Sequence, residues 1–250
     1  MQADSPRIAL ITGGGAGIGL ATARAFAAAG TRAVITGRNE ARLAAAARQA
    51  PGIDYIVADA ASEADAERTV ATTIQRWGRL DVLVNNAGAG AILPLAQAGA
   101  DRIAAIFATN VIGPSLLARA ALPHLKAAAG AIVNVSSTFG HKAAAGLSHY
   151  AASKAALEHM TRCWALEFAA DGIRVNAVAA GPTETRFLED RMRLSPEQIE
   201  AVKADERARI PLGRRGEPED VAPWIVSLAM PGSAWITGQV LRVDGGLVIA

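Results

Sequence analysis

The sequence predicts a single α/β domain over residues 1–250, built on a doubly wound parallel sheet of about seven strands with helices on both faces. Short apolar runs alternate with alanine-rich stretches of helical length along the whole chain. Most of these runs are apolar throughout rather than at every second residue, which is typical of strands buried on both faces. The links between them are short, and no linker divides the chain.

The elements follow one another as strand, helix, strand, and right-handed crossovers then place helices on both faces of the sheet. The last predicted helix begins with a proline and acidic residues, as helix N-termini commonly do. The predicted strands are Ile8–Thr12, Ala33–Thr36, Ile53–Val57, Val82–Asn85, Ala131–Ser136, Arg174–Val178 and Val240–Val243. The predicted helices are Ile18–Ala29, Glu40–Gln49, Glu63–Trp77, Arg102–Lys126, Ala151–Ala169 and Pro218–Leu228.

Residues 183–211 form the least regular segment of the sequence, because they are polar, charged and poor in alanine. The segment follows a strand and therefore lies at the carboxyl edge of the sheet, where such folds bind ligands. We interpret it as a mobile lid over a substrate site. An ordinary surface loop is the alternative.

Composition and charge argue against several classes of function. The net charge is only +2, and no Lys/Arg cluster suggests a nucleic-acid partner. The single cysteine, Cys163, forms no intrachain disulfide and fits a reducing compartment. We find neither the pattern of a signal peptide nor an apolar run long enough to span a bilayer. The four histidines lack the spacing of a metal site. We therefore expect a cytoplasmic protein without a metal or a membrane partner.

A glycine-rich turn, GGGAGIG, lies between the first predicted strand and the first predicted helix. Backbone amides at the start of such a helix can bind a pyrophosphate, and glycine allows the phosphates to approach closely. A tight turn without a ligand is the alternative. The turn follows a strand, opens a helix and begins a βαβ unit, and this context favours a dinucleotide site.

The spacing of Gly13, Gly17 and Gly19 resembles the TGxxxGxG motif of the short-chain dehydrogenase/reductase (SDR) family. Further motifs of that family follow in the expected order over nearly the whole chain. They are NNAG at Asn85–Gly88, YAASK at Tyr150–Lys154, GPTET at Gly181–Thr185, and the C-terminal ITGQVLRVDGG. The resemblance implies a Rossmann fold and a nicotinamide cofactor.

The resemblance also implies which residues bind the cofactor. Two positions depart from the family pattern: Ala180 stands where a proline is usual, and Ala16 stands where some NADP-dependent members carry a basic residue. The implied cofactor-binding residues are Gly13, Gly15, Gly17, Ile18, Gly19, Arg38, Asp59, Ala60, Asn86, Ala87, Gly88, Tyr150, Lys154, Gly181, Thr183 and Thr185.

The end of the second predicted strand indicates the type of cofactor. NAD-preferring relatives place an acidic residue there to bind the ribose 2′-hydroxyl. In this chain that position is Gly37, and Arg38 follows it. A guanidinium can bind a 2′-phosphate through two parallel hydrogen bonds. The sequence therefore favours NADP(H) over NAD(H), with a solvated Arg38 as the alternative.

Tyr150 and Lys154 lie four residues apart and therefore on one face of a helix. At a separation of about 4 Å and an effective dielectric constant of about 20, an ammonium stabilises a phenolate by about 4 kcal/mol. We expect this attraction to lower the tyrosine pKa from about 10 toward neutrality. Such a tyrosine could exchange a proton with a carbonyl or an alcohol.

Ser137 and Asn110 complete the catalytic set that the resemblance implies. Ser137 would orient the reacting oxygen, and Ser136 is its competitor for that role. The carbonyl of Asn110 would hold a water in a proton relay to Lys154. Pro114 lies four residues after Asn110 and has no amide hydrogen, so we expect that carbonyl to be free.

The sequence thus predicts an NADP(H)-dependent oxidoreductase that transfers hydride between the nicotinamide and a carbonyl or secondary alcohol. A non-catalytic NADP-binding regulator or scaffold, and an epimerase or dehydratase on a related Rossmann fold, are the alternatives. The substrate stays open among sugars, ketoacyl thioesters, steroid-like rings and polyketides.

Two predicted helices, 110–126 and the one after Tyr150, carry apolar residues on more than one face. A helix that is apolar nearly all round needs a partner on its outer side. We therefore expect a homodimer or homotetramer, as the resemblance also implies. The residues concerned are Leu116, Leu117, Leu157, Trp164 and Phe168.

Overall fold

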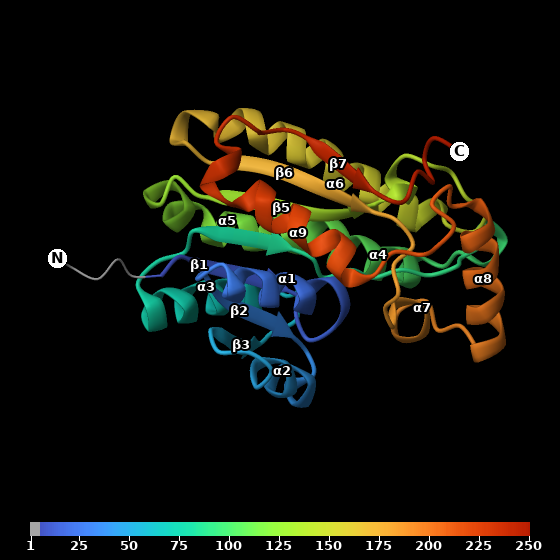
Figure 1. Cartoon of the computed structure of the whole chain (residues 1–250), viewed down its shortest axis with the longest axis horizontal. Coiled ribbons are helices and arrows are strands. Elements are labelled where there is room, and N and C mark those ends of the chain that lie inside the picture. Colours follow the sequence, from blue (N-terminus) through green and yellow to red (C-terminus); the bar gives the residue numbers. More distant parts are fainter. Residues whose placement is uncertain (1–5) are drawn as a thin grey trace.

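A computed structural model describes residues 6–250 and confirms the predicted fold class, with a parallel sheet and helices on both of its faces (Figure 1). The strands are β1 (Ile8–Thr12), β2 (Arg32–Gly37), β3 (Ile53–Val57), β4 (Val82–Asn85), β5 (Ala131–Ser137), β6 (Arg174–Ala180) and β7 (Val240–Val243). The helices are α1 (Gly17–Ala28), α2 (Glu40–Ala47), α3 (Glu63–Trp77), α4 (Ala100–Phe107), α5 (Gly113–Ala127), α6 (Ser148–Glu167), α7 (Phe187–Asp190), α8 (Pro196–Arg209) and α9 (Pro218–Ala229).

The strand order is β3-β2-β1-β4-β5-β6-β7, and all pairings are parallel. The chain runs outward from β1 to β3 and then returns to place β4 on the other side of β1. This reversal is the switch point at which doubly wound sheets bind ligands beyond the carboxyl ends of their strands.

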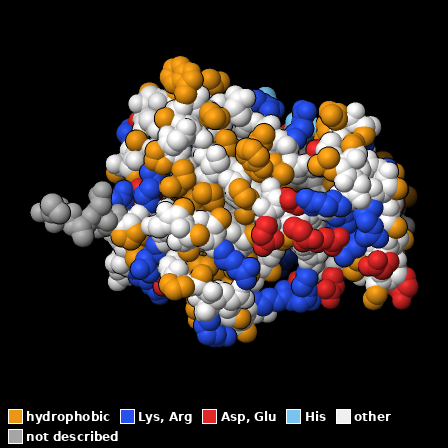
Figure 2. Space-filling model, in the orientation of Figure 1, with side chains coloured by type: hydrophobic (Ala, Val, Ile, Leu, Met, Phe, Trp, Pro, Cys, Tyr) orange, Lys and Arg blue, Asp and Glu red, His pale blue; other side chains and the backbone are white. Residues whose placement is uncertain are grey.

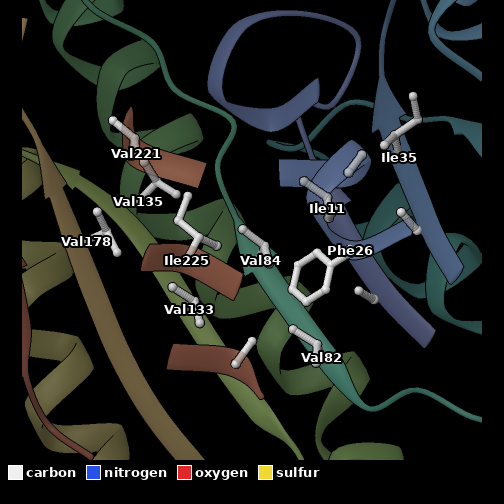
Figure 3. Packing of buried hydrophobic residues seen from close by; sticks show 14 of the residues in the cluster. Ile11, Phe26, Ile35, Val82, Val84, Val133, Val135, Val178, Val221 and Ile225 are labelled. Carbon is white, nitrogen blue, oxygen red and sulfur yellow. The ribbon is translucent and has the colours of Figure 1, made fainter. Parts of the chain in front are cut away.

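The sheet divides two hydrophobic clusters, because successive strand residues point to opposite faces. Val82 and Val84 pack with α1 and α9, whereas Leu83 between them packs with α3 and α5. Figure 3 shows Phe26 of α1 beside Val82 and Val84 in the first cluster. Phe26 is fully buried. Packing on both faces explains why the strand sequences are apolar throughout.

The predicted helix 102–126 is instead two helices joined by a π-turn at Ala108–Ile112. Pro114 has no amide hydrogen to donate to the carbonyl of Asn110, so the regular helical ladder is interrupted here. π-Turns inside helices are frequent at functional sites. The irregularity places Asn110, fully buried, at the centre of the turn.

The segment 183–211 is more regular than its composition suggested, because it contains α7 and α8. Ser195 caps α8: its hydroxyl accepts from the amide of Gln198, whose side chain accepts from the Ser195 amide. Pro196 takes the first helical position. Both helices lie beyond the arrowheads of the strands (Figure 1). The structure therefore places this segment where a lid would lie.

Buried ion pairs tie this segment to the loop before α9. Arg215 is almost completely buried and forms ion pairs with Glu184 and with Glu206 of α8. Glu184 also bonds Lys203 of α8 at 2.7 Å. These pairs fix the base of the segment, since removing one partner would leave a buried charge uncompensated.

One continuous helical segment, Ala100–Ala127, has the length and apolar composition of a membrane span. The prediction that no segment is long and apolar enough to span a bilayer is therefore wrong with respect to length and composition. Leu117, Ala121 and Leu125 in this segment lie in the hydrophobic core, and a core helix passes the same test.

Candidate active site

A cavity of about 740 Å³ lies at the carboxyl edge of the sheet, between the ends of the central strands and the segment containing α7 and α8. It brings together most of the residues that the sequence singled out. On its wall lie Gly13, Gly15, Gly17, Ile18, Gly19, Arg38, Asn86, Ala87, Gly88, Ser137, Tyr150, Lys154, Gly181, Thr183 and Thr185.

The glycine turn is held against the end of β4. Asn86 donates through Nδ2 to the carbonyls of Thr12 and Gly13 at 2.8 and 3.2 Å, and the Thr12 hydroxyl accepts from the amides of Asn86 and Ala87. A side chain at Gly19 would place its Cβ about 2.5 Å from Asn86 Nδ2. This packing explains why the NNAG segment accompanies the glycine turn.

The same turn fits a dinucleotide. Ala16, the N-cap of α1, offers no side-chain acceptor, and the first turn of α1 contains no acidic residue. Gly15 lines the open space of the cavity, and a Cβ there would make only ordinary van der Waals contacts, at 3.5 Å or more, with Leu43 and Arg42. The unpaired amides of a helix N-terminus beside such space bind phosphate.

Ser137, Tyr150 and Lys154 meet in the cavity wall. Ser137 ends β5, and the other two lie one turn apart in α6; all three are buried. Tyr150 and Ser137 share a side-chain hydrogen bond. Lys154 donates from Nζ to the carbonyl of Val135 at 2.9 Å. A phenol, a hydroxyl and an ammonium therefore lie in the wall of the same cavity as the glycine turn.

The expected direction of the Tyr150 pKa is wrong for this structure. Burial raises the pKa of Tyr150, and the hydrogen bond with Ser137 opposes that shift. The Nζ atom of Lys154 lies 6.0 Å from the centroid of the tyrosine ring and faces the Val135 carbonyl instead. Burial also lowers the pKa of Lys154 to about 8, against the attraction of Glu158. Desolvation is therefore the largest influence on the pKa of both side chains.

Asn110 lies behind this group rather than on the cavity wall. Its Nδ2 donates to the Ala89 carbonyl and to the Ser153 hydroxyl, and its Oδ1 accepts from the Ala89 amide. Ser153 in turn donates to the carbonyl of Tyr150. The Asn110 side chain thus joins the loop after β4 to α6 and holds the helix that carries Tyr150 and Lys154. A water on its backbone carbonyl stays a prediction.

Ser136 and Ser137 take different partners. Ser136 donates to Glu158 at 2.6 Å, and Glu158 also pairs with His141 at 2.8 Å. Burial raises the pKa of Glu158. No local sequence pattern points to this buried carboxyl. Its bond to Ser136 leaves Ser137 as the serine beside Tyr150.

The wall beyond the end of β2 is basic. The Arg38 side chain is 62% exposed, and its closest carboxylate contact is Asp59, at 3.8 Å. Arg42 and Arg191 line the same part of the cavity but were not predicted. Arg42 follows Arg38 by four residues and lies in the first turn of α2, so its closeness to Arg38 in the sequence could have revealed it. Arg191 comes from the distant α7 segment, and no local pattern links it to β2.

Asp59 and Ala60 lie away from the cavity wall. The amide of Asp59 donates to Asp65, and a side chain on Gly113 of α5 would overlap the Ala60 carbonyl. Both residues therefore help to pack the loop after β3. Within residues 6–250, no group of three or more His, Cys, Asp or Glu side chains could hold a metal ion.

The wall near Tyr150 is apolar. The ring of Phe187 in α7 lies 6.0 Å from that of Tyr150, centroid to centroid, with an interplanar angle of 48°. Ile92, Leu147 and Met192 line the same cavity. Apolar side chains therefore surround the buried phenol on this side of the cavity, as is common in sites for small organic ligands.

Fold and site together define a dinucleotide-binding protein with a buried Ser–Tyr–Lys group. Comparison with known proteins supports this class of protein. Residues 13–248 match the family model described as enoyl-(acyl carrier protein) reductase. The chain belongs to the short-chain dehydrogenase/reductase family of oxidoreductases, whose members bind a nicotinamide cofactor.

Relatives that are named for different activities match nearly the whole chain. The 3-oxoacyl-(acyl-carrier-protein) reductase of Thermotoga maritima is 39% identical over 97% of this chain and 98% of its own. The L-fucose dehydrogenase of Bos taurus is 35% identical over 96% and 88%. The crystal structure of 3-ketoacyl-(acyl-carrier-protein) reductase from Brucella melitensis, complexed with NADH, matches with a TM-score of 0.89 at 32% identity, covering 97% of this chain and 98% of that one.

Proposed function

We propose that this protein is an NADP(H)-dependent oxidoreductase that interconverts a carbonyl compound and a secondary alcohol. The observation that carries the proposal is the buried group of Ser137, Tyr150 and Lys154 in the same cavity as the glycine turn. Bound NADP(H) would supply or accept the hydride. The cavity is large enough for ligands of several hundred cubic ångströms.

Tyr150 donates the proton to the carbonyl oxygen in reduction and removes it from the alcohol in oxidation. Its raised pKa keeps the phenol protonated at neutral pH, which is the form that reduction requires. Ser137, already bonded to the phenol, holds the reacting oxygen. Lys154 contributes positive charge beside the phenol and binds the nicotinamide ribose, and Asn110 fixes the helix that carries it.

A non-catalytic NADP-binding regulator is the weaker alternative, because a regulator has no use for a buried tyrosine and lysine. Burial of the Lys154 ammonium lowers its pKa and so opposes stability at neutral pH. Such a group is retained more readily for chemistry than for packing. An epimerase or dehydratase would use a similar cavity and would leave the total amount of NADPH unchanged in an assay.

We propose NADP(H) rather than NAD(H) on the basis of Gly37 and Arg38. No carboxylate from Gly37 competes with a 2′-phosphate, and the exposed Arg38 guanidinium has only the distant Asp59 as an ion-pair partner in the part of the chain that the structure describes. The structural relative from Brucella was solved with NADH, which is a property of that protein. Both cofactors therefore need to be tested.

Arg38→Ala is expected to weaken NADPH binding by about ten- to a hundredfold and NADH binding by much less, because only NADPH carries the phosphate. Calorimetric titration of both cofactors against both proteins measures this. Arg48→Ala, at the C-terminal end of α2 and away from the cavity wall, is the matched control. Equal losses for the two cofactors would contradict the assignment.

We also propose a homodimer or homotetramer, on a narrower basis than the sequence suggested. Leu117, Leu157 and Phe168 are buried within the chain and need no partner subunit. Ile112 and Leu166, in the π-turn before α5 and in α6, are exposed large apolar residues. A stable monomer in a sedimentation experiment at micromolar concentration would refute the proposal.

We also propose a cytoplasmic location, which the single cysteine favours. Cell fractionation tests this location.

A further inference from the structure

Three arginine side chains meet at the part of the cavity beyond β2. Arg38 follows β2, Arg42 lies in the first turn of α2, and Arg191 directly follows α7; all three line the cavity. The pKa of Arg191 is lowered, first by burial and then by the charge of Arg38. Figure 2 shows basic and acidic side chains gathered around α7 on this face. Segments far apart in the sequence thus place like charges together.

The nearby carboxylates satisfy these arginines unequally. Arg42 donates to Asp190 at 2.7 Å, and this contact raises the pKa of Arg42. Among the described residues, Arg38 has only the 3.8 Å ion pair with Asp59. No hydrogen bond or ion pair within residues 6–250 holds the Arg191 guanidinium, although Asp190 and Asp59 lie close enough to raise its pKa. Two weakly neutralised guanidinium groups on a cavity wall favour a dianionic ligand group.

The place of this cluster identifies the anion. In doubly wound folds the ribose of a dinucleotide lies at the end of the second strand, while the pyrophosphate lies on the first helix. An anion beside Arg38 is therefore a substituent of that ribose. A phosphate at the ribose 2′ position matches the location and the two available guanidinium groups.

We propose that Arg191 binds the 2′-phosphate of NADP together with Arg38, so that the segment carrying α7 contributes to cofactor discrimination. This inference rests on the proposed NADP(H)-dependent function. The Arg42–Asp190 ion pair joins α2 to α7 and thereby positions Arg191. The start of the segment also lies against the glycine turn, because a Cβ at Gly17 would come within 2.9 Å of Thr185.

Equilibrium binding to Arg191→Ala tests the proposal without an activity assay. NADPH, NADH and adenosine 2′,5′-bisphosphate are titrated into the wild-type protein, Arg191→Ala, Arg193→Ala and Arg38→Ala. Arg193 lies in the same loop but not on the cavity wall, so its replacement removes the same charge without touching the site. We expect Arg191→Ala to bind NADPH and the bisphosphate about ten- to a hundredfold more weakly. NADH binding to that variant, and all binding to Arg193→Ala, should stay close to wild type.

The possible outcomes distinguish a failure of the proposed cofactor preference from a failure of the proposed role of Arg191. If the wild type binds NADPH no better than NADH, the proposed cofactor preference fails and the role of Arg191 fails with it. If NADPH is preferred and the preference depends on Arg38 but not on Arg191, only the role of Arg191 is overturned. Equal weakening of NADPH and NADH by Arg191→Ala would also overturn it, since that result indicates a general effect on the fold of the segment.

Discussion

Tyr150→Phe is expected to lower turnover by about 10²–10⁴-fold, because it removes the group that exchanges a proton with the substrate oxygen. The phenylalanine ring fills the same buried space, so the fold and the cofactor cavity should persist. NADPH affinity should therefore stay nearly unchanged, and the loss should appear in kcat. Single-turnover kinetics on a carbonyl substrate, together with NADPH titration, measure the two quantities separately.

The chain offers a matched control for this variant, because Tyr55 is its only other tyrosine. Tyr55 lies in β3, away from the cavity wall. Tyr55→Phe removes the same hydroxyl and should keep wild-type turnover. If Tyr150→Phe retains most of the wild-type activity on a validated substrate, the assignment of the general acid/base is wrong.

Lys154→Met is expected to abolish most of the turnover without destabilising the protein at pH 7. Burial lowers the Lys154 pKa from 10.5 to about 8, so keeping this ammonium charged in the folded protein opposes stability by about 3 kcal/mol below that pH. Methionine removes this penalty but leaves the Val135 carbonyl without its donor, at a cost of about 1–3 kcal/mol. The relief of the desolvation penalty and the loss of the hydrogen bond to Val135 nearly cancel. The variant gains a little stability when the relief is the larger of the two.

The pH dependence distinguishes this explanation from simple packing. Because the folded-state pKa is lowered, the unfolded chain binds more protons between pH 8 and 10.5, and the stability of the wild type rises with pH through that window. Lys154→Met lacks this contribution. The difference in unfolding free energy between the two proteins should therefore move in favour of the wild type from pH 7 to pH 10 in denaturant titrations.

Lys142→Met provides the control, because Lys142 also donates to a backbone carbonyl, that of Leu247, but outside the cavity wall. A Lys154→Met protein that is several kcal/mol less stable than the wild type, by the same amount at both pH values, would refute the desolvation argument. Lysine would then act at this position mainly through packing and its hydrogen bond.

The fold could be predicted from the sequence because its signals are local. The strands are continuously apolar, and the glycine turn, the NNAG segment and the YxxxK spacing lie within short stretches of chain. β5 and β6 extend slightly beyond their predicted ends, to Ser137 and Ala180, because both strands stay paired there. The point at which a strand ends depends on such pairing partners, which the local sequence does not contain.

The missed features depend on contacts between distant segments or on burial. α8 was overlooked although the Ser195–Gln198 capping pair and Pro196 mark its start, because its charged composition outweighed those signals. Arg191 reaches the cavity only through the α7 segment. The direction of the Tyr150 pKa depends on how completely the chain buries the phenol, and a spacing of four residues carries no information on burial.

The most direct test of the central claim is a screen of carbonyl compounds with the wild-type protein, following the loss of NADPH absorbance. Ketones attached to apolar groups should be included, because apolar side chains line the cavity near Tyr150. The account predicts that at least one such ketone is reduced to its alcohol with equimolar consumption of NADPH, and that Tyr150→Phe loses this activity. If the protein binds NADPH but consumes none with any carbonyl compound, or if Tyr150→Phe reduces the ketone as fast as the wild type, the proposed function is contradicted.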